Sequence, residues 1–480
     1  MLAGSTAQRN LVAFYTPPAV AAHMTRMLRV NRRSRILEPA GGDGAFVTPL
    51  LRSGTVTPEQ ITVWDVDAAV APLMHSLGVN FSLRDGLLNP ENPKGAYTHV
   101  IGNPPYLNKQ SAYIKTHRHQ LRKLYAEIGA HDTYAMFTYM ALRQLAPGGQ
   151  LVFLLSDTFL TLGIHRRFRQ HLLNYRIDSV TLLPKGSFPQ ASVNTCIVEA
   201  TKHPAPPGHE VRFIDCRHLP PGSFDGTEHR VAQHELGNHP GALFVFGEAH
   251  RTLTAIRGME PLHTLLDGGL GMYTTDNRRY LAAIERAEGE GRSWHQSVRP
   301  DDVDGVRWVP YHKQGGDRRW WAEVEFAVDW RDESRQHYGI PSSVSDRFDA
   351  EGNPREGFLV SGVASRLAAR MMQPGALWDS NKVSAFFPKD SDRYPPEFFC
   401  AILNSSVYGR IAKALNHTVS LQIRDLRQLP MLPFTPAEID HLTRLGKAAI
   451  RRTRQGQPTD SIEKRIDAVV EEAWRRVVDR

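Results

Sequence analysis

The residues Asn103-Pro104-Pro105-Tyr106 form the motif whose chemistry is most specific in this chain. Two successive prolines remove two backbone donors and fix two φ angles, so the turn is rigid and its carbonyl oxygens point in a defined direction. Fixed acceptors suit a planar amine, because each of its hydrogens can be held. Tyr106 adds an aromatic face on which a ring can stack. We therefore predict a site for a planar amine, with a purely structural turn as the alternative.

A glycine-rich turn at 36–46 (ILEPAGGDGAF) follows an apolar run of strand type. Glycines let the backbone approach a ligand closely, and open α/β sheets bind ligands at the carboxyl ends of their strands. Asp65 ends the next apolar run, where a carboxylate can accept from ribose hydroxyls. The plainer interpretations are a tight turn and a helix cap, and Asp67 suits the cap better. Together these features predict a nucleotide-like cofactor.

The elements that must position these motifs lie between Pro17 and about Cys216. Apolar β-type runs alternate there with helical-period segments, which is typical of a parallel sheet with helices on both faces. Pro17 and Pro18 open the first helix, and APGG at 146–149 ends the helix that begins near Tyr134. Strands are predicted at 35–38, 61–65, 99–102, 150–156, 179–183 and 193–200. The fold class is α/β.

The composition predicts a globular protein of two or three domains, with 480 residues, 41% of them hydrophobic and 22% charged. No apolar run approaches the roughly 18 residues of a membrane span, and the first ten residues lack a secretory signal, so we expect a cytoplasmic protein. Cys196, Cys216 and Cys400 form neither a disulfide framework nor a metal clip, and we expect them to be buried without a metal. The net charge of +8 favours a polyanionic partner.

Turn-forming residues at 203–228 predict the first domain boundary. We expect an α/β domain at 1–228, a mixed α+β domain at 229–435 and a helical segment at 436–480. In the last segment apolar residues such as Ile439, Leu442 and Leu445 recur at helical spacing.

The order of the motifs resembles that of adenine-N6 DNA methyltransferases of the gamma class. In that family an N-terminal cofactor motif precedes the glycine turn, the Asn-Pro-Pro-Tyr motif and a target recognition domain. Residues 9–18 (RNLVAFYTPP) resemble the first motif, and 38–46 (EPAGGDGAF) match the glycine turn at each defined position. The resemblance covers residues 1 to about 200 and implies a Rossmann-like methyltransferase domain, S-adenosylmethionine as cofactor and double-stranded DNA as substrate.

The resemblance also implies roles for individual residues. Glu38 would face the methionine part of the cofactor, Asp65 its ribose and Asp85 its adenine amine. The whole cofactor set is Tyr15, Thr16, Glu38, Ala40, Gly42, Gly44, Phe46, Asp65, Val66 and Asp85. The catalytic set is Asn103, Pro104, Pro105, Tyr106 and Phe188. Phe188 would be a second aromatic wall of the base pocket, although a phenylalanine in a loop otherwise packs into a core.

The expected chemistry starts from adenine's exocyclic nitrogen, whose lone pair is delocalised into the ring. The Asn103 side-chain oxygen and the Pro104 carbonyl would accept its two hydrogens and align the nitrogen with the methyl group, without a strong general base. Tyr106 would stack on the flipped-out base.

Basic residues predict DNA contacts in two regions. The segment at 107–132 would either clamp phosphates or form a solvated helix face. The second region resembles recognition parts of Type IIG and phage-exclusion methyltransferases through 313–320 (KQGGDRRW) and Asn404-Ser405-Ser406. Of Trp320 and Trp321, one should face the core and leave the other for DNA. The candidate DNA contacts are Lys109, Lys313, Arg318, Arg319, Trp320, Lys382 and Arg424.

Two other functions stay open. Asn-Pro-Pro-Tyr also occurs in methyltransferases that act on a glutamine side chain, and a DNA-specificity protein without catalysis would keep the second domain. Since the first cofactor motif starts by about residue 9, we expect no nuclease domain ahead of it. A restriction endonuclease partner would then be a separate chain, and the enzyme would work in a restriction–modification or an orphan system.

Overall fold

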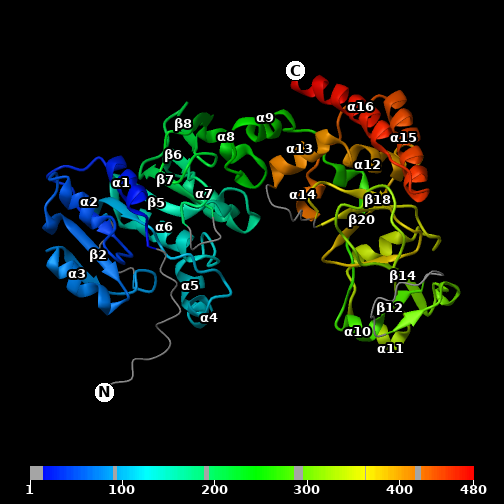
Figure 1. Ribbon diagram of the computed structural model, residues 1–480, viewed down its shortest axis with the longest axis horizontal. Helices are drawn as coiled ribbons and strands as arrows, with labels where there is room; N and C mark the ends of the chain where they lie inside the picture. Colours follow the sequence, from blue (N-terminus) through cyan, green and yellow to red (C-terminus); the bar gives the residue numbers. More distant parts are fainter. Residues whose placement is uncertain are drawn as a thin grey trace. The chain divides into compact units, whose positions relative to one another are not determined.

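The computed structural model describes residues 15–89, 95–188, 194–285, 296–362, 364–416 and 423–479. The chain divides into two compact units, Met1–His250 and Arg251–Arg480 (Figure 1). Residue 228, where we expected the first domain to end, lies inside strand β9 (Thr227–Ala232). This strand pairs with β8 (Glu210–Asp215), so the first unit extends further along the chain than predicted.

A nine-stranded sheet forms the centre of the first unit, in the order β3-β2-β1-β4-β5-β7-β6-β8-β9. Its first seven strands along the chain are β1 (Ile36–Glu38), β2 (Ile61–Asp65), β3 (Asn80–Leu83), β4 (Tyr97–Gly102), β5 (Leu145–Ser156), β6 (Arg176–Leu182) and β7 (Thr195–Thr201). β7 and β9 run antiparallel to their neighbours, and the remaining pairings are parallel. The predicted mostly parallel sheet is confirmed.

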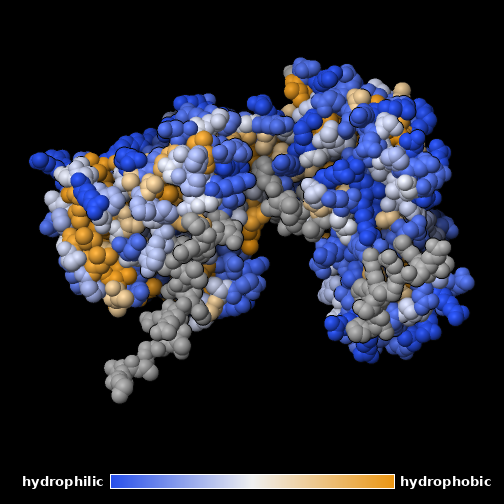
Figure 2. All heavy atoms as spheres, in the orientation of Figure 1, coloured by the Kyte–Doolittle hydropathy of each residue, from blue (hydrophilic) through white to orange (hydrophobic). Residues whose placement is uncertain are grey.

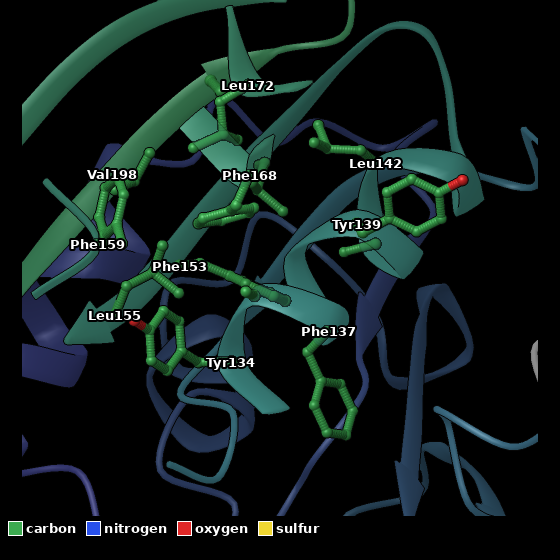
Figure 3. Packing of buried hydrophobic residues seen from close by; sticks show 14 of the residues in the cluster. Tyr134, Phe137, Tyr139, Leu142, Phe153, Leu155, Phe159, Phe168, Leu172 and Val198 are labelled. Carbon is green, nitrogen blue, oxygen red and sulfur yellow. The ribbon is translucent and has the colours of Figure 1, made fainter. Parts of the chain in front are cut away.

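Helices cover both faces of this sheet. They are α1 (Pro18–Met27), α2 (Val47–Arg52), α3 (Ala71–Ser76), α4 (Ala112–Thr116), α5 (Arg118–Leu124), α6 (Thr133–Gln144), α7 (Arg166–Leu172) and α8 (Gln233–Asn238), and α9 (Gly247–Ala255) follows. Ile36 packs in one core with residues of α1, α2 and α3, whereas Leu37 packs in the other with residues of α4 to α7. Successive residues of a strand point to opposite faces, which explains this alternation. Figure 3 shows Tyr134 and Phe137 of α6 near Phe153 of β5 in the second of these cores.

Most predicted elements of this unit exist, with shifted ends. The predicted strand at 61–65 matches β2, and Pro18 is the first residue of α1, as predicted. α6 ends at Gln144, and the APGG residues belong to the start of β5. β3, β8 and β9 were not predicted. β3 has only four residues, and none of them is buried.

The second unit contains a four-stranded, a five-stranded and a two-stranded sheet. Their strands are β10 (Leu266–Leu270), β11 (Tyr273–Thr274), β12 (Leu281–Ile284), β13 (Ser297–Val298), β14 (Trp308–His312), β15 (Phe326–Asp329), β16 (Tyr338–Gly339), β17 (Phe358–Ser361), β18 (Ala369–Met371), β19 (Leu377–Trp378) and β20 (Val383–Pro388). The helices are α10 (Asn277–Tyr280), α11 (Asp332–Arg335), α12 (Pro396–Leu403), α13 (Ser406–Leu415), α14 (Ile423–Arg427), α15 (Pro436–Arg454) and α16 (Asp460–Val478). This mixed α+β composition confirms the expected class.

The predicted C-terminal helices are confirmed as α15 and α16, and they belong to the second unit. Thr435 and Glu438 form a capping box at the start of α15, which satisfies backbone donors at that end. Leu442 of α15 and Val470 of α16 are completely buried, and both helices pack against α12. All three cysteines are buried and free, as expected. Among the described residues, no helix is both long and apolar enough to span a bilayer.

Candidate active site

One cavity of the first unit lies where β1, β2 and β4 end. It encloses about 1070 Å³, including space open to solvent, which is a size typical of small-molecule sites. The predicted site residues that line it are Tyr15, Thr16, Glu38, Ala40, Gly42, Phe46, Asp65, Val66, Asp85, Asn103, Pro104, Pro105 and Tyr106. The carboxyl ends of parallel strands meet at one edge of a sheet, so motifs that are far apart in sequence converge there.

The glycine turn after β1 lies directly against β2. The N–H of Gly41 donates to Trp64 O at 3.0 Å, and the N–H of Gly44 donates to Gly41 O at 2.9 Å. A Cβ on Gly41 would lie 2.2 Å from Cγ1 of Val63, so a side chain there would displace Val63. Gly42 and Gly44 have φ values of +49° and +72°, which favour glycine. Gly44 does not line the cavity, so its contribution is the shape of the turn.

Asp65 connects this turn to the end of β2. Its Oδ2 accepts from the N–H of Gly42 at 2.8 Å, and its Oδ1 accepts from the N–H of Asp67 at 2.9 Å. A carboxylate has about four lone-pair positions, so Asp65 can accept further hydrogen bonds from a ligand. Asp67 accepts from the N–H of Ala69 at the start of a short 3-10 helix, which confirms it as the cap.

Glu38 is the most unusual carboxyl group of the cavity. Its side chain is 2% exposed, and Oε2 has no hydrogen-bond partner among the described residues. Burial raises the pKa of Glu38 well above its ordinary value, and the negative charges of Asp43 and Asp65 raise it further. An unpartnered buried carboxyl oxygen is costly. The site therefore fits a ligand that brings a cationic hydrogen-bond donor to Glu38.

Asp85 lines the same cavity and holds an unpredicted residue, Tyr113 of α4. The Tyr113 hydroxyl donates to Asp85 Oδ2 at 2.8 Å, and the N–H of Leu87 donates to Oδ1 at 2.8 Å. Burial raises the pKa of Tyr113, and the Asp85 charge raises it further, so Tyr113 stays a protonated donor. Tyr113 also lines the cavity.

The Asn103 motif follows β4 and is braced from two sides. The Asn103 side-chain amide donates to Thr16 Oγ1 at 3.1 Å, which defines the orientation of the amide. Thr133, the first residue of α6, donates its hydroxyl to Pro105 O and accepts from the N–H of Leu107 at 2.9 Å. The rigidity predicted from the two prolines is therefore reinforced by helix α6.

Tyr106 lies between the cavity and the core around α6. Its ring packs edge-on against Tyr134 with centroids 5.8 Å apart. Its hydroxyl is buried and has no hydrogen-bond partner among the described residues. Burial raises the pKa of Tyr106 well above its ordinary value, so the phenol stays neutral. Tyr106 also lines the cavity, as an aromatic wall should.

Phe188 is placed differently from the rest of the predicted catalytic set. It is 7% exposed and belongs to the core that contains Val20 and Ile197, and it does not line the cavity. Residues 189–193 lie outside the described part of the chain. The structure thus gives Phe188 the core position that was its alternative, and its role as a second aromatic wall stays a prediction.

The remaining cavity-lining residues were not singled out from the sequence. They are Pro39, Gly41, Asp43, Ala45, Arg84, Gly86, Leu87, Leu107, Tyr113, Thr133 and Phe137. Several of them are next to predicted motif residues in the sequence, and this adjacency could have indicated that they line the cavity. Thr133 and Phe137 carry no such signal, because only the docking of α6 brings them to the cavity.

Two predicted DNA contacts of the second unit, Lys313 and Arg318, already have acidic partners. Lys313 Nζ lies 3.6 Å from Asp379 Oδ2, and an Arg318 guanidinium nitrogen lies 3.1 Å from Glu325 Oε1. Their side chains are 21% and 37% exposed. Both would have to share or exchange their partners to bind a phosphate.

Trp320 and Arg319 both bind Glu463 within the second unit. Trp320 is 2% exposed, and its indole N–H donates to Glu463 Oε1 of α16 at 2.9 Å. Arg319 pairs with the other oxygen of Glu463 at 2.8 Å. The ring of Trp320 is almost completely buried, so its role as a DNA contact has no support in its position and stays a prediction. Trp321 is half-buried, and the Arg454 guanidinium lies 3.6 Å above its ring.

The other predicted DNA contacts are Lys109, Lys382 and Arg424. Lys109 in the first unit and Lys382 in the second are exposed. The side chain of Arg424 lies outside the described residues, as do residues 9–14 of the predicted N-terminal motif.

Comparison with known proteins identifies the region around the motif. Residues 66–187 match the family model described as Eco57I restriction-modification methylase. The Type II methyltransferase M.HincII of Haemophilus influenzae is 26% identical over 170 residues, which cover 34% of this chain and 32% of the relative. The adenine-specific methyltransferase PglX of Lacticaseibacillus casei (strain Zhang) is 20% identical over 381 residues, covering 72% of this chain and 30% of the relative. The chain thus spans about a third of the length of these curated relatives.

Among solved structures, a nuclease-deletion mutant of the Type ISP restriction-modification enzyme LlaGI in complex with a DNA substrate mimic has a TM-score of 0.58 at 12% identity. The match covers 92% of this chain and 55% of that one. The Type ISP enzyme LlaBIII bound to DNA has a TM-score of 0.57 at 10% identity, covering 93% and 40%. At such identity these likenesses concern the fold. The family match is confined to residues 66–187, and it shows that this region is similar to Eco57I restriction-modification methylases.

Proposed function

We propose that this chain is a site-specific DNA methyltransferase that transfers a methyl group from S-adenosylmethionine to N6 of a flipped-out adenine in double-stranded DNA. In this proposal the first unit catalyses the transfer and the second unit recognises the target sequence. Within the second unit, the residues up to 435 would form the target recognition domain, and residues 436–480 would form a C-terminal helical segment.

The observation that carries the proposal is the shared cavity. It brings the unpartnered carboxyl oxygen of Glu38 together with the carboxylates of Asp65 and Asp85 and the rigid turn of Asn103 and Tyr106. This transfer needs three things. One is an acceptor for a cationic group, the second is a pair of carboxylates that accept from hydroxyl and amine groups, and the third is a turn that binds an amine. They converge from separate segments of the chain.

The residues on the cofactor side fit S-adenosylmethionine. Glu38 would accept from the α-amino group, which would give its buried oxygen the missing partner. Asp65 would accept from the ribose hydroxyls, and Asp85 would accept from the adenine amine beside Tyr113. When bound, the cofactor supplies an electrophilic methyl group on sulfur.

The residues on the substrate side act on the target amine. Asn103 and the Pro104 carbonyl would accept hydrogen bonds from the NH2 group, which favours a tetrahedral nitrogen. The nitrogen would form the new C–N bond with its own lone pair while the methyl–sulfur bond breaks and its electron pair goes to sulfur. The nitrogen would then release one proton to solvent, so no strong base is required. Tyr106 would stack on the base, which must leave the duplex to reach the cavity.

The relatives support this choice of substrate without deciding it. PglX is named as adenine-specific, and M.HincII as a Type II methyltransferase. The second unit offers room for target recognition that a glutamine methyltransferase would not need. Double-stranded DNA is therefore the proposed partner, and a separately encoded restriction endonuclease would be the second partner in a restriction–modification system.

A transfer assay with tritiated S-adenosylmethionine tests the proposal. The full chain is incubated with mixed double-stranded DNA, RNA and protein, and the labelled product is digested and identified by chromatography. We expect label in N6-methyladenine from DNA. Label in a protein glutamine would support the rival methyltransferase, and label in N4-methylcytosine would change the target base.

A silent specificity protein would give a different result. It would bind double-stranded DNA without any transfer, even though the cofactor binds in a separate titration. Mapping the modified adenines in DNA from cells that express the chain would then give the recognised sequence for an active enzyme.

A further inference from the structure

The helices α4 and α5 present a strongly cationic surface that the cavity does not use. Between Leu107 and Ala126 the sequence contains no Asp or Glu. Lys109, Lys115, Arg118, Arg122 and Lys123 are all exposed. None of the carboxylates in the described part of the chain forms an ion pair with any of these five side chains. Figure 2 shows hydrophilic side chains over the tip that these helices form in Figure 1.

Several of these cationic side chains lie close to one another. Arg118 and Arg122 are four residues apart in α5, so they lie on the same face. Lys109 and Arg122 both lower the pKa of His131, after the larger effects of its burial and of His165. The two cations therefore approach the same ring from the loop and from α5. Arg122 therefore has a cationic neighbour on its own helix, Arg118, and another in the preceding loop, Lys109.

The helix pair is anchored beside the cavity. Ile114 and Leu121 are buried in the core that includes α6. Tyr113 of α4 donates to Asp85, and the Tyr125 hydroxyl donates to Leu87 O at 2.9 Å. Asp85, Leu87 and Tyr113 all line the cavity. The cationic surface is thus fixed to the wall of the candidate active site.

From this arrangement we infer that α4 and α5 form a clamp for the DNA backbone at the entrance of the active site. Their cations would bind phosphates of double-stranded DNA next to the flipped-out adenine, independently of base sequence. This inference rests on the proposed function. An unpaired positive surface of this kind releases counterions from DNA when it binds, so its contribution must depend on salt.

The test replaces three of these cations by glutamine in the full chain, in the variant K115Q/R118Q/R122Q. The matched control is R32Q/R33Q/R52Q, which removes the same charge from the same unit. Arg32, Arg33 and Arg52 are exposed. The first two precede β1, and Arg52 ends α2, which leads away from the cavity. They therefore lie toward the amino ends of the strands, remote from the proposed clamp.

DNA affinity is measured by fluorescence anisotropy over a series of salt concentrations. The slope of log affinity against log salt should become shallower by about 0.9 for each phosphate contact that is lost. For three contacts, the affinity at about 0.1 M salt should fall on the order of 100-fold, whereas the control should bind like wild type. The affinity for S-adenosylmethionine should be unchanged in both variants, because none of the replaced side chains lines the cavity.

A charge-conserving variant, K115R/R118K/R122K, keeps the test independent of folding. It should retain the salt slope of wild type. If the glutamine variant binds cofactor normally and keeps both wild-type affinity and wild-type slope, the clamp is wrong. If wild type binds cofactor but no DNA at any salt concentration, the proposed function itself is wrong and the clamp fails with it.

Discussion

The two units treat their predicted functional residues in different ways. In the first unit, almost every predicted residue lines one cavity at the carboxyl ends of β1, β2 and β4. In the second unit, Lys313, Arg318 and Arg319 are paired with carboxylates, and Trp320 is buried. The residues that we chose from backbone motifs lie mostly in the cavity, as predicted. The residues that we chose because their side chains suit DNA mostly form ion pairs within the unit or are buried in it.

The electrostatics of the two regions also differ. Burial raises the pKa of Glu38 in the cavity, and it raises the pKa of Asp157, which follows β5, to about 6. Burial would also raise the pKa of Glu463 in the second unit. There, hydrogen bonds from Trp320 and Thr459 and the charge of Arg319 outweigh burial and lower the pKa. The unpartnered oxygen of Glu38 marks a site that fits a ligand, whereas the carboxylate of Glu463 already has its hydrogen-bond partners within the protein.

The segment around Trp320 shows how the second unit uses its predicted residues. Trp320 has a φ of +70°, a left-handed value that is unfavourable for a bulky residue. Its N–H donates to Ala369 O at 2.8 Å, and its carbonyl accepts from the N–H of Met371 at 3.0 Å. Glu463 holds its indole. A residue that is held on all sides in this way is a structural anchor.

Replacing Trp320 should give the largest effect. We expect Trp320→Ala to reduce the free energy of unfolding of the second unit by about 3–5 kcal/mol, because it removes a buried aromatic side chain and the donor to Glu463. Urea denaturation followed by circular dichroism measures it. Trp321→Ala is the matched control and should lose much less. Equal losses would contradict the contrast between a buried and a half-buried tryptophan.

The second largest effect tests the first unit. Asn103→Ala should lower the turnover number on the order of 100–1000-fold, because one preorganised acceptor of the target amine is lost. Cofactor affinity, measured by calorimetric titration, should stay close to wild type. A large loss of cofactor affinity would move Asn103 to the cofactor side of the cavity and remove its proposed role.

The pKa of Asp157 predicts a pH-dependent effect. Its folded-state value of about 6 lies above its ordinary 3.8. Its contribution to stability is therefore fully present below about pH 3.8 and is lost as the pH rises through 6. At pH 8, Asp157→Asn should be more stable than wild type by up to about 3 kcal/mol, since one pKa unit corresponds to about 1.4 kcal/mol.

Unfolding curves at pH 4 and pH 8 measure this difference. Glu463→Gln should behave in the opposite direction, because the folded-state pKa of Glu463 is lowered. The stability that Glu463 contributes is present above its ordinary pKa and is lost as the pH falls through the folded value. The same sign for both variants would mean that the two regions do not differ electrostatically in the way described.

The smallest effect is expected at Arg318. Its ion pair with Glu325 is partly exposed, so Arg318→Gln should change the free energy of unfolding by about 0.5 kcal/mol or less. If Arg318 contacts DNA, the same variant should weaken DNA binding while the fold is unaffected. Unchanged DNA affinity in the anisotropy assay would assign Arg318 to its contact with Glu325, which also accepts a hydrogen bond from Gln314.

The sequence by itself determined the α/β class of the first unit, the two C-terminal helices and most of the candidate site. Glycines at 41, 42 and 44 and prolines at 104 and 105 restrict the backbone locally, so their consequences can be predicted without knowing the fold. Strand ends then bring such turns to one edge of the sheet. The capping box of Thr435 and Glu438 is local in the same way.

Tertiary structure decided what depends on partners from distant parts of the chain. Thr133 reaches Pro105 only because α6 docks against the sheet, and Tyr113 reaches Asp85 only because α4 does. Trp320 became a core residue because Glu463, far along the chain, accepts its indole hydrogen. A side chain that can bind DNA can equally bind an internal carboxylate, and only the packed chain shows which partner lies within reach.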